Sequence, residues 1–169
     1  SSKKTPFRGG INWNDLDIRD ININAHDLGF KGGVMSGILE RLTFKEKSGW
    51  SPESISGEAT VGNGKTLIKD LHITDRWSDL KLPEFIMTYR NSKVFANFNE
   101  EVKIDGNIAP SSLDFRTLHY FAPQLKNNRI KARVSGQMCG YVSDFEIKNM
   151  DIAVKEGGFA GKLNGRITG

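Results

Sequence analysis

The sequence predicts a mainly β protein: a curved, elongated antiparallel sheet, open like a groove or taco, built from repeated hairpins with one short helix. Three observations predict this fold. Apolar and polar residues alternate over most of the chain, which is typical of half-buried strands. The 18 glycines lie inside that alternation or in pairs at turns. Glycine-centred segments recur 30 and 29 residues apart, from Gly106 to Gly136 to Gly165, a period typical of stacked repeats.

The length and composition fit one domain. The chain has 169 residues, enough to bury a core of its own. We expect residues 1–10 to be a flexible N-terminal segment, and residues 11–169 to be a single β-repeat domain that is a fragment of a longer protein. Lys and Arg total 24 and Asp and Glu total 20, so no acidic tail or basic arm is present. The single Cys139 cannot form an internal disulfide.

The first strand is predicted over residues 16–25, with a bulge. Its apolar residues keep to every second position except for one polar step of two residues at Arg19-Asp20. A bulge adds one residue to a strand and returns the apolar set to the same face. The same pattern recurs over residues 145–154, and a shorter copy covers residues 68–73.

A second kind of strand carries a glycine between two apolar residues. Glycine at this position lies on the same face as its apolar neighbours, so each copy leaves a gap on the apolar side. A strand glycine costs about 0.5–1 kcal/mol relative to alanine, which indicates that the gaps serve curvature or room. The four groove glycines are Gly57, Gly106, Gly136 and Gly165.

Glycine turns join these strands into hairpins. Gly32-Gly33 and Gly157-Gly158 lie between a bulged strand and the strand that follows it, and residues 62–65 read as another hairpin turn. Two further strands are expected over residues 85–89 and 94–98. The total is about ten strands.

One segment reads as a helix, over residues 112–121. Ser111 followed by Asp114 resembles a capping box, and Pro123 ends the run. We interpret this helix as a cap packed over the apolar face of the sheet; the alternative is a mobile gate over a groove.

No pattern in the sequence indicates catalysis, a metal site or a cofactor. His26, His72 and His119 have no partner at metal-ligand spacing. Asp70, His72 and Asp75 could meet near one strand end, but their spacing is better explained as a solvated face. The basic residues alternate with acidic ones instead of forming a stripe, which argues against nucleic-acid binding. We therefore expect a protein that is not an enzyme.

Several segments resemble the TamB family of translocation and assembly modules, which are related to AsmA-like proteins. The likeness is carried by residues 11–18, by residues 43–50, by Thr74 and Ser78 on either side of a strand break, and by residues 112–123. It covers most of residues 11–169.

The resemblance implies a periplasmic protein anchored in the inner membrane, whose repeats form a curved, open sheet with an apolar concave side. Such proteins are bridges that carry phospholipid toward the outer membrane and cooperate with outer-membrane barrel assembly proteins. The partners implied are phospholipid acyl chains, barrel assembly proteins and neighbouring repeats of the same chain. A fragment with unpaired edges is also expected to form edge-paired oligomers.

The apolar pattern fits a lipid groove independently, because acyl chains need a continuous aliphatic strip and no directional polar contacts. The alternative is that these residues bury one another in a closed sandwich. The predicted lining residues are Ile18, Ile23, Ile55, Ile73, Ile104, Ile108, Val134, Met138, Ile152, Leu163 and Ile167.

Two other functions stay open at this point. One is a chaperone or interaction module that pairs a sheet edge with strands of outer-membrane proteins during their assembly and secretion. The other is an extracellular carbohydrate-binding β-domain that stacks sugars on Trp13, Trp50 and Trp77.

Overall fold

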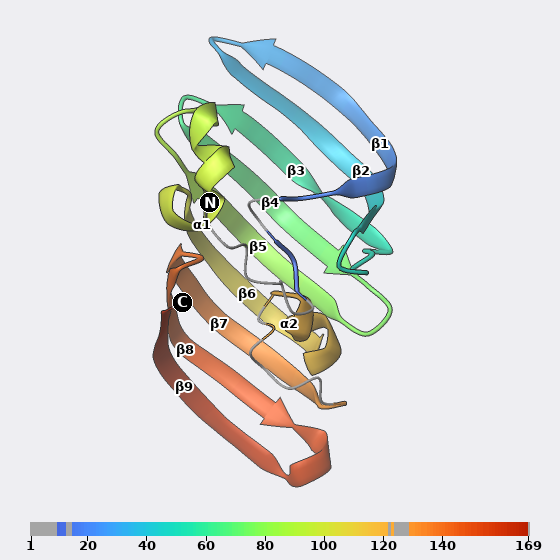
Figure 1. The fold of residues 1–169 in the computed structure, drawn as a ribbon, viewed down its shortest axis with the longest axis vertical. Helices are drawn as coiled ribbons and strands as arrows, with labels where there is room; N and C mark the ends of the chain where they lie inside the picture. Colours follow the sequence, from blue (N-terminus) through green and yellow to red (C-terminus); the bar gives the residue numbers. More distant parts are fainter. Residues whose placement is uncertain (1–9, 13–14, 122, 124–128, 169) are drawn as a thin grey trace, which may run out of the picture.

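The computed structural model describes residues 10–12, 15–121, 123 and 129–168. These residues form one antiparallel sheet of nine strands, in which every strand pairs with the next one along the chain (Figure 1). The strands are β1 (Ile18–Lys31), β2 (Val34–Glu46), β3 (Ser54–Gly62), β4 (Lys65–Thr74), β5 (Asp79–Thr88), β6 (Lys103–Asp114), β7 (Lys131–Tyr141), β8 (Asp144–Val154) and β9 (Phe159–Thr168).

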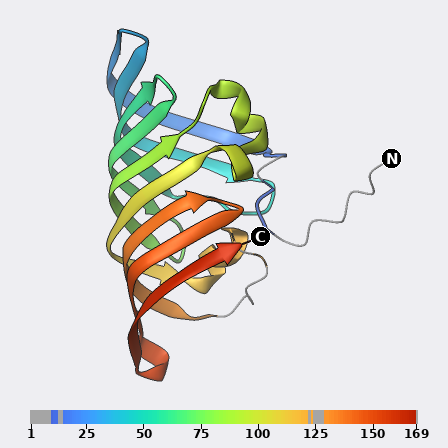
Figure 2. The ribbon, with the colours of Figure 1, turned by 90° about the vertical axis from the view of Figure 1, so that its left-hand side faces the viewer.

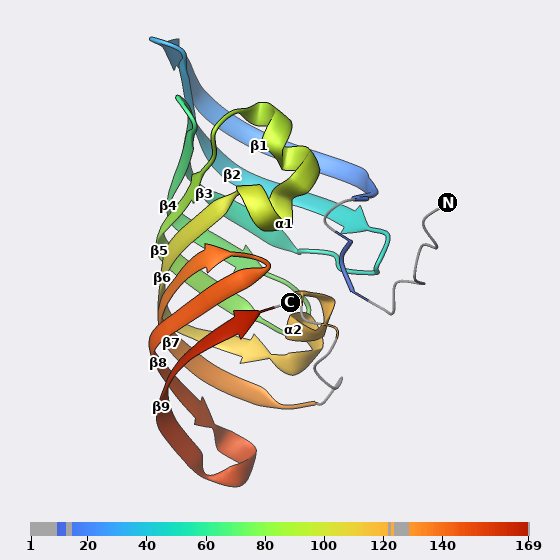
Figure 3. The same cartoon turned by 60° about the vertical axis from the view of Figure 1, so that its left-hand side comes forward.

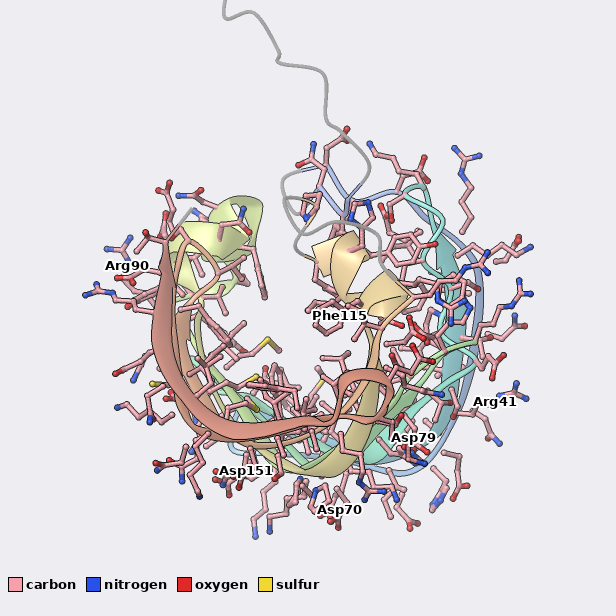
Figure 4. All side chains as sticks on the ribbon, turned by 90° about the horizontal axis from the view of Figure 1, so that it is seen from below. Arg41, Asp70, Asp79, Arg90, Phe115 and Asp151 are labelled. Carbon is pink, nitrogen blue, oxygen red and sulfur yellow. The ribbon has the colours of Figure 1, made fainter. Side chains whose placement is uncertain are left out.

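The sheet is open and curved, with its helices on one side. Seen from the side, the strands bend around a concave face (Figure 2). The 3₁₀ segment η1 (Ser92–Asn97) and helix α1 (Phe98–Glu101) lie at one rim of this face, and α2 (Phe115–Phe121) lies toward the other (Figures 3 and 4). A short 3₁₀ turn, η2 (Lys155–Gly157), joins β8 to β9. The mainly β, curved, open fold predicted from the sequence is confirmed.

Strand register divides the side chains between two faces. In the β4–β5 pair, Leu71 lies opposite Leu82 and Ile73 opposite Leu80, while His72 lies opposite Lys81. Directly paired residues share a face, so one face is apolar and the other mostly polar. Viewed from below, Arg41, Asp70, Asp79, Arg90 and Asp151 point away from the curved sheet (Figure 4). The apolar set therefore occupies the concave face.

The three predicted bulges are present, and each has a residue with positive φ. These residues are Asp20, Asp70 and Asn149, with φ of 53°, 51° and 49°. The register shifts at each of them, in the pairs β1–β2, β3–β4 and β8–β9. Asp and Asn tolerate this backbone region better than other non-glycine residues, which explains why the polar step carries them.

Glycines in the neighbouring strands leave room for two of these bulges. A Cβ at Gly57 would lie 2.8 Å from Ile68 Cγ2 and 3.0 Å from Lys69 O, beside the bulge at Asp70. A Cβ at Gly136 would lie 2.9 Å from Asn149 O. Backbone of the bulged strand thus fills the gap on the glycine strand. These two glycines permit the close approach that the bulge requires.

The core of the described residues is small and one-sided. Ala132, Val134 and Met150 form its buried centre. Half-buried apolar side chains of the concave face and of α2 pack around it; they are Leu80, Ile108, Leu113, Phe115, Ile147, Ile152 and Val154. The described residues contain no second sheet over this face, so the closed sandwich is excluded for them.

The strand predicted over residues 94–98 is wrong. This segment is η1 followed by α1, and the described residues contain two short α-helices where one was predicted. Asn91 caps the turn, because its side-chain oxygen accepts a hydrogen bond from Lys93 N. Val94 and Val102 are 4% and 0% exposed, and with Phe98 between them they repeat every four residues. The apolar residues of this segment fit the two-residue period of a strand, but the buried residues follow the period of a helix.

The predicted start of the second helix is also wrong. Residues 111–114 complete β6, and α2 begins at Phe115. Ser111 is not a cap: its hydroxyl accepts a hydrogen bond from Lys81 N and donates one to Ala109 O. Asp114 caps the helix, because its carboxylate accepts from Arg116 N at 2.9 Å. The described strands number nine, and not about ten as predicted.

We expect Gly136→Ala to lower the free energy of unfolding by about 1–3 kcal/mol. Gly136 has φ of +154°, and a Cβ there would lie 2.8 Å from Met150 Cα. The obstacle is backbone, which cannot rotate away. Urea unfolding followed by circular dichroism measures the change.

Gly165→Ala is the matched control, because a Cβ at Gly165 meets nothing within 4 Å. This control should leave the free energy of unfolding unchanged or raise it by about 0.5 kcal/mol. Equal stabilities of the two variants would show that Gly136 does not serve the bulge.

Candidate functional site

The predicted lining residues share the concave face, and their exposure depends on the strand that carries them. Val134 is buried, and six central residues are half-buried: Ile55, Ile73, Ile104, Ile108, Met138 and Ile152. Ile18, Ile23 and Leu163, on the strands at the two ends of the sheet, are 40%, 65% and 46% exposed. Ile167 pairs with Phe145, but its side chain lies outside the described residues.

Large apolar side chains are exposed at both ends of the concave face. By register and alternation, eight of them point to this face from β1, β2 and β9. They are Ile18, Ile21, Ile23, Leu28, Phe30, Met35, Phe159 and Leu163. Groups of exposed large apolar side chains mark a binding surface more often than an ordinary solvent face.

The four groove glycines do not have one common role. Bulged backbone occupies the space beside Gly57 and Gly136. Side chains occupy the space beside Gly106, where a Cβ would lie 3.1 Å from Met138 Cε and 3.4 Å from Phe85 Cδ2. Of the four, Gly165 alone faces open space.

A buried carboxylate fastens α2 to the rim of the sheet. Asp75 lies in the β4–β5 connection and is 9% exposed. Its carboxylate accepts hydrogen bonds from Trp50 Nε1 at 3.1 Å, from the backbone N–H groups of Trp77 and Ser78 at 2.9 and 2.8 Å, and from Thr117 Oγ1 at 2.8 Å. Four donors from three segments thus converge on one side chain, which we call the Asp75 hub.

Two hydroxyls extend the Asp75 hub to β6. Ser78 Oγ donates to Thr117 Oγ1 at 2.8 Å and accepts from Asp114 N at 2.8 Å. Ser78 and Thr117 are 5% and 3% exposed. Each hydroxyl accepts one hydrogen bond and donates the next. The hydrogen bonds of this series therefore all point toward the Asp75 carboxylate and polarise one another.

Aromatic rings pack around the Asp75 hub. Trp50 meets Phe44 and Phe121 edge to face, with ring centroids 5.5 and 5.0 Å apart. Tyr120 stacks on Trp77 with ring centroids 6.4 Å apart, and Tyr120 O accepts from Ile11 N at 2.7 Å. The helix is therefore held by both packing and hydrogen bonds.

These contacts bear on the tryptophans proposed as sugar-stacking residues. Trp50 is 8% exposed, so its ring offers no open face to a sugar. Trp77 is half-buried between Tyr120 and two arginines. Trp13 lies outside the described residues. The described part of the chain thus gives the carbohydrate hypothesis no exposed ring among these three residues.

Two further buried carboxylates lie near the same rim. Burial raises the pKa of Glu46, but hydrogen bonds from the Ser48 side chain and backbone and from neighbouring amides outweigh burial and leave this pKa below its ordinary value. The side-chain hydrogen bonds from Arg116 hold the pKa of Asp114 below its ordinary range, against the opposing effect of burial. Both groups are therefore held as carboxylates.

The opposite rim is held by apolar contacts and by hydrogen bonds to the backbone of α1. Val94 and Val102 bury their side chains there, and Asn99 O accepts hydrogen bonds from Ser143 N and Oγ at 3.1 and 3.0 Å. The Asn97 amide contacts both Glu100 and Glu101, and Arg90 pairs with Glu101 at 3.8 Å.

The acid and histidine residues considered for catalysis do not share a site. His72 Nε2 contacts Asp79 Oδ1 at 2.7 Å on the outer face, and Asp70 lies at the bulge. Asp75 instead forms the buried hub. Within the described residues no group of three His, Cys, Asp or Glu side chains could hold a metal ion.

Two shallow hollows lie mostly on the outer face. The first, about 290 Å³, is lined by residues such as Asp105, Gln137 and Lys148, and the second, about 400 Å³, by residues such as Arg133 and Lys162. Both are open to solvent, and neither gathers residues with a chemical role. The concave face is the more distinctive surface.

Sequence reasoning missed the Asp75 hub. Asp75 and Thr117 are 42 residues apart, and no local pattern connects them. The one available signal was the polar run at Thr74-Asp75 and Ser78. In such a turn the Asp side chain accepts hydrogen bonds from the backbone N–H groups two and three residues later.

Comparisons with protein-family models, with curated proteins and with solved structures found no match. Among the described residues, none of the helices has the length and apolar character needed to cross a membrane.

We expect Asp75→Ala to lower the free energy of unfolding by about 2–5 kcal/mol, because it leaves several buried donors without an acceptor. Asp79→Ala, which removes a half-exposed carboxylate on the outer face, should cost less than about 1 kcal/mol. Urea unfolding compares the two.

If Asp75→Ala does not fold, Thr117→Val provides a milder test, because it removes one hydroxyl of similar volume. It should cost about 1–2 kcal/mol. A loss no larger than that of Asp79→Ala in both variants would contradict the role of the Asp75 hub.

The carboxylate of Asp114 should make stability depend on pH. Its pKa is lowered in the folded chain, so its contribution is present above the unfolded value of about 4 and is lost as the pH falls through the folded pKa. Asp114→Asn should therefore be less stable than wild type at pH 7, and the difference should shrink below about pH 4. Urea midpoints from pH 2 to 7 measure it; a difference independent of pH would refute this account.

Proposed function

We propose that this chain is a non-catalytic segment of an envelope-spanning β-groove protein that conducts phospholipid between the inner and outer membranes. The acyl chains lie against the concave face. The observation that carries this proposal is the set of eight large apolar side chains exposed on that face in β1, β2 and β9.

The physical argument is that the concave face suits hydrocarbon and little else. It is mainly apolar across the sheet, because the registers of all eight strand pairs keep most apolar residues on this face. Each methylene removed from water contributes about 0.8 kcal/mol without any directional contact. An acyl chain therefore gains binding energy wherever it lies along the strip and can move without breaking specific bonds.

The cellular setting rests on the resemblance to the TamB family. That resemblance supports a periplasmic location, an inner-membrane anchor elsewhere in the protein and cooperation with outer-membrane barrel assembly proteins. The open curved sheet is consistent with it, because a repeat of this kind stacks on its neighbours through its edge strands.

A second candidate function is pairing with unfolded strands of outer-membrane proteins. It is favoured by the edges: within the described residues β1 pairs only with β2, and β9 only with β8. Main-chain hydrogen bonds at an edge supply such binding. They do not depend on the apolar face, so the two functions respond differently to changes on that face.

We expect organic extracts of the purified chain to contain phospholipid by mass spectrometry, and Ile23→Asp to reduce the amount about threefold to tenfold, since it places a charge on an apolar contact worth about 1 kcal/mol. Ile23 is 65% exposed, so the variant should fold. Samples are compared at concentrations where the chain sediments as a monomer, because its free edges can pair.

Asn24→Asp is the matched control, since Asn24 is the next residue and points to the outer face opposite Arg41. It should retain lipid like the wild type. Absence of lipid from wild type, or equal loss in both variants, would refute lipid conduction. Binding of a barrel-derived peptide that persists in Ile23→Asp would then favour strand pairing.

A further inference from the structure

All four methionines of the chain lie on the concave face. Directly paired residues share a face. One row of pairs on this face, from β2 to β5, consists of Met35, Val61, Thr66 and Met87. Met150 belongs to the buried core of the face, and Met138 Cε lies beside Gly106. The one cysteine, Cys139, follows Met138 and by alternation points to the outer face. The thioether sulfurs therefore line the surface proposed for acyl chains.

The four methionines differ in exposure. Met35, on β2 near one end of the sheet, is 55% exposed, whereas Met150 is 7% exposed. Met87 and Met138, on the central strands, are half-buried. The oxidation of a sulfur side chain depends on how exposed it is. A dissolved oxidant therefore reaches the sulfur of Met35 before those of the other three.

A hydroperoxide oxidises the thioether of methionine to a sulfoxide, which is polar. A lone pair of the sulfur attacks the terminal oxygen of the hydroperoxide, so an S–O bond forms while the O–O bond breaks. The proton of that terminal hydroxyl passes to the departing oxygen, which leaves as an alcohol or, from hydrogen peroxide, as water. The sulfur is oxidised and the peroxide is reduced by the same electron pair, so the step needs no other reactant.

A sulfoxide at Met35 would find no hydrogen-bond donor on its cross-strand neighbours. Met35 lies opposite Phe30 on β1 and opposite Val61 on β3, and neither of these side chains carries a donor. The sulfoxide oxygen would therefore keep its hydrogen bonds to water. An acyl chain lying over it would remove that water without replacing the hydrogen bonds, which is unfavourable. Oxidation of Met35 thus opposes the binding of hydrocarbon at this place.

We infer that Met35 is a site of reversible oxidation by hydroperoxides, and that its sulfoxide weakens the binding of acyl chains at the β1–β2 end of the concave face. This inference rests on the proposed function and adds redox control to it. Methionine sulfoxide reductases return both sulfoxide epimers to the thioether, and the exposed side chain of Met35 is accessible to them. Because Met150 is buried, the core keeps its thioether while the exposed end of the face changes.

The test treats the purified chain with hydrogen peroxide, removes the peroxide, and then offers phosphatidylglycerol with saturated acyl chains from detergent micelles. Mass spectrometry quantifies the lipid on the protein, and peptide mapping locates each sulfoxide. The reference protein is Cys139→Ala, which removes the competing thiol of the outer face. The matched control adds Met35→Leu to this reference, because leucine has a similar volume and stays apolar in peroxide.

We expect the sulfoxide to form first at Met35 and last at Met150. Once Met35 is oxidised, the reference protein should retain about threefold to tenfold less lipid, because a polar group replaces one apolar contact. Methionine sulfoxide reductases with a dithiol reductant should restore the retained lipid. The Met35→Leu control should retain the same amount of lipid with and without peroxide. Melting curves before and after treatment should match, since Met35 is exposed.

The other outcomes separate this inference from the proposed function. Unchanged lipid on a chain whose Met35 is oxidised, or an equal loss in the Met35→Leu control, would overturn the inference and leave the groove in place. So would earlier oxidation of Met87 or Met138, or a lower melting temperature after treatment, since unfolding would then explain the loss. Retention of no lipid by the untreated reference protein would instead overturn the proposed function itself.

Discussion

The apolar side chains of this sheet can occupy a single face only if each long strand corrects its own alternation. A strand that slips by one residue moves every following side chain to the other face. Asp20, Asp70 and Asn149 prevent this, because each inserts one residue in a left-handed conformation. The division into an apolar face and a polar outer face depends on these insertions, and Gly57 and Gly136 make those at Asp70 and Asn149 sterically possible.

Contacts at the two rims stabilise a sheet that has little buried core. A one-layer sheet buries few side chains completely. Among the described residues, Val102 and Pro52 are the largest side chains that are fully buried. The Asp75 hub compensates at one rim by joining three segments through buried hydrogen bonds. Such a network is strong when it is fully satisfied and costly when one member is removed. The other rim relies on Val94 and Val102 and on backbone contacts to Asn99.

The sequence was sufficient for the features that depend on near neighbours. The two-residue step at Arg19-Asp20 indicated a bulge, and the pair Gly32-Gly33 indicated a tight turn, whose φ values of 59° and 76° fit type I′. It was insufficient where two periods fit equally well, as at Val94 and Phe98, which suit both a strand and a helix.

The sequence was also insufficient where partners are distant. No local pattern brings Asp75 to Thr117, because this contact follows from the pairing of whole strands. The sequence also could not predict that the concave face is left uncovered by the described residues. Alternation of apolar residues is identical in a filled sandwich and in an open sheet, so only the tertiary arrangement distinguishes them.

The end strands have a consequence for selectivity. Because β1 and β9 carry apolar side chains up to the last described strand at each end, and no described residue closes the sheet there, a molecule lying along the sheet meets no terminal wall. Under the proposed function, the sheet would therefore discriminate between lipids by the cross-section of an acyl chain and not by its length. A short tail and a long one would be held with the same energy per carbon.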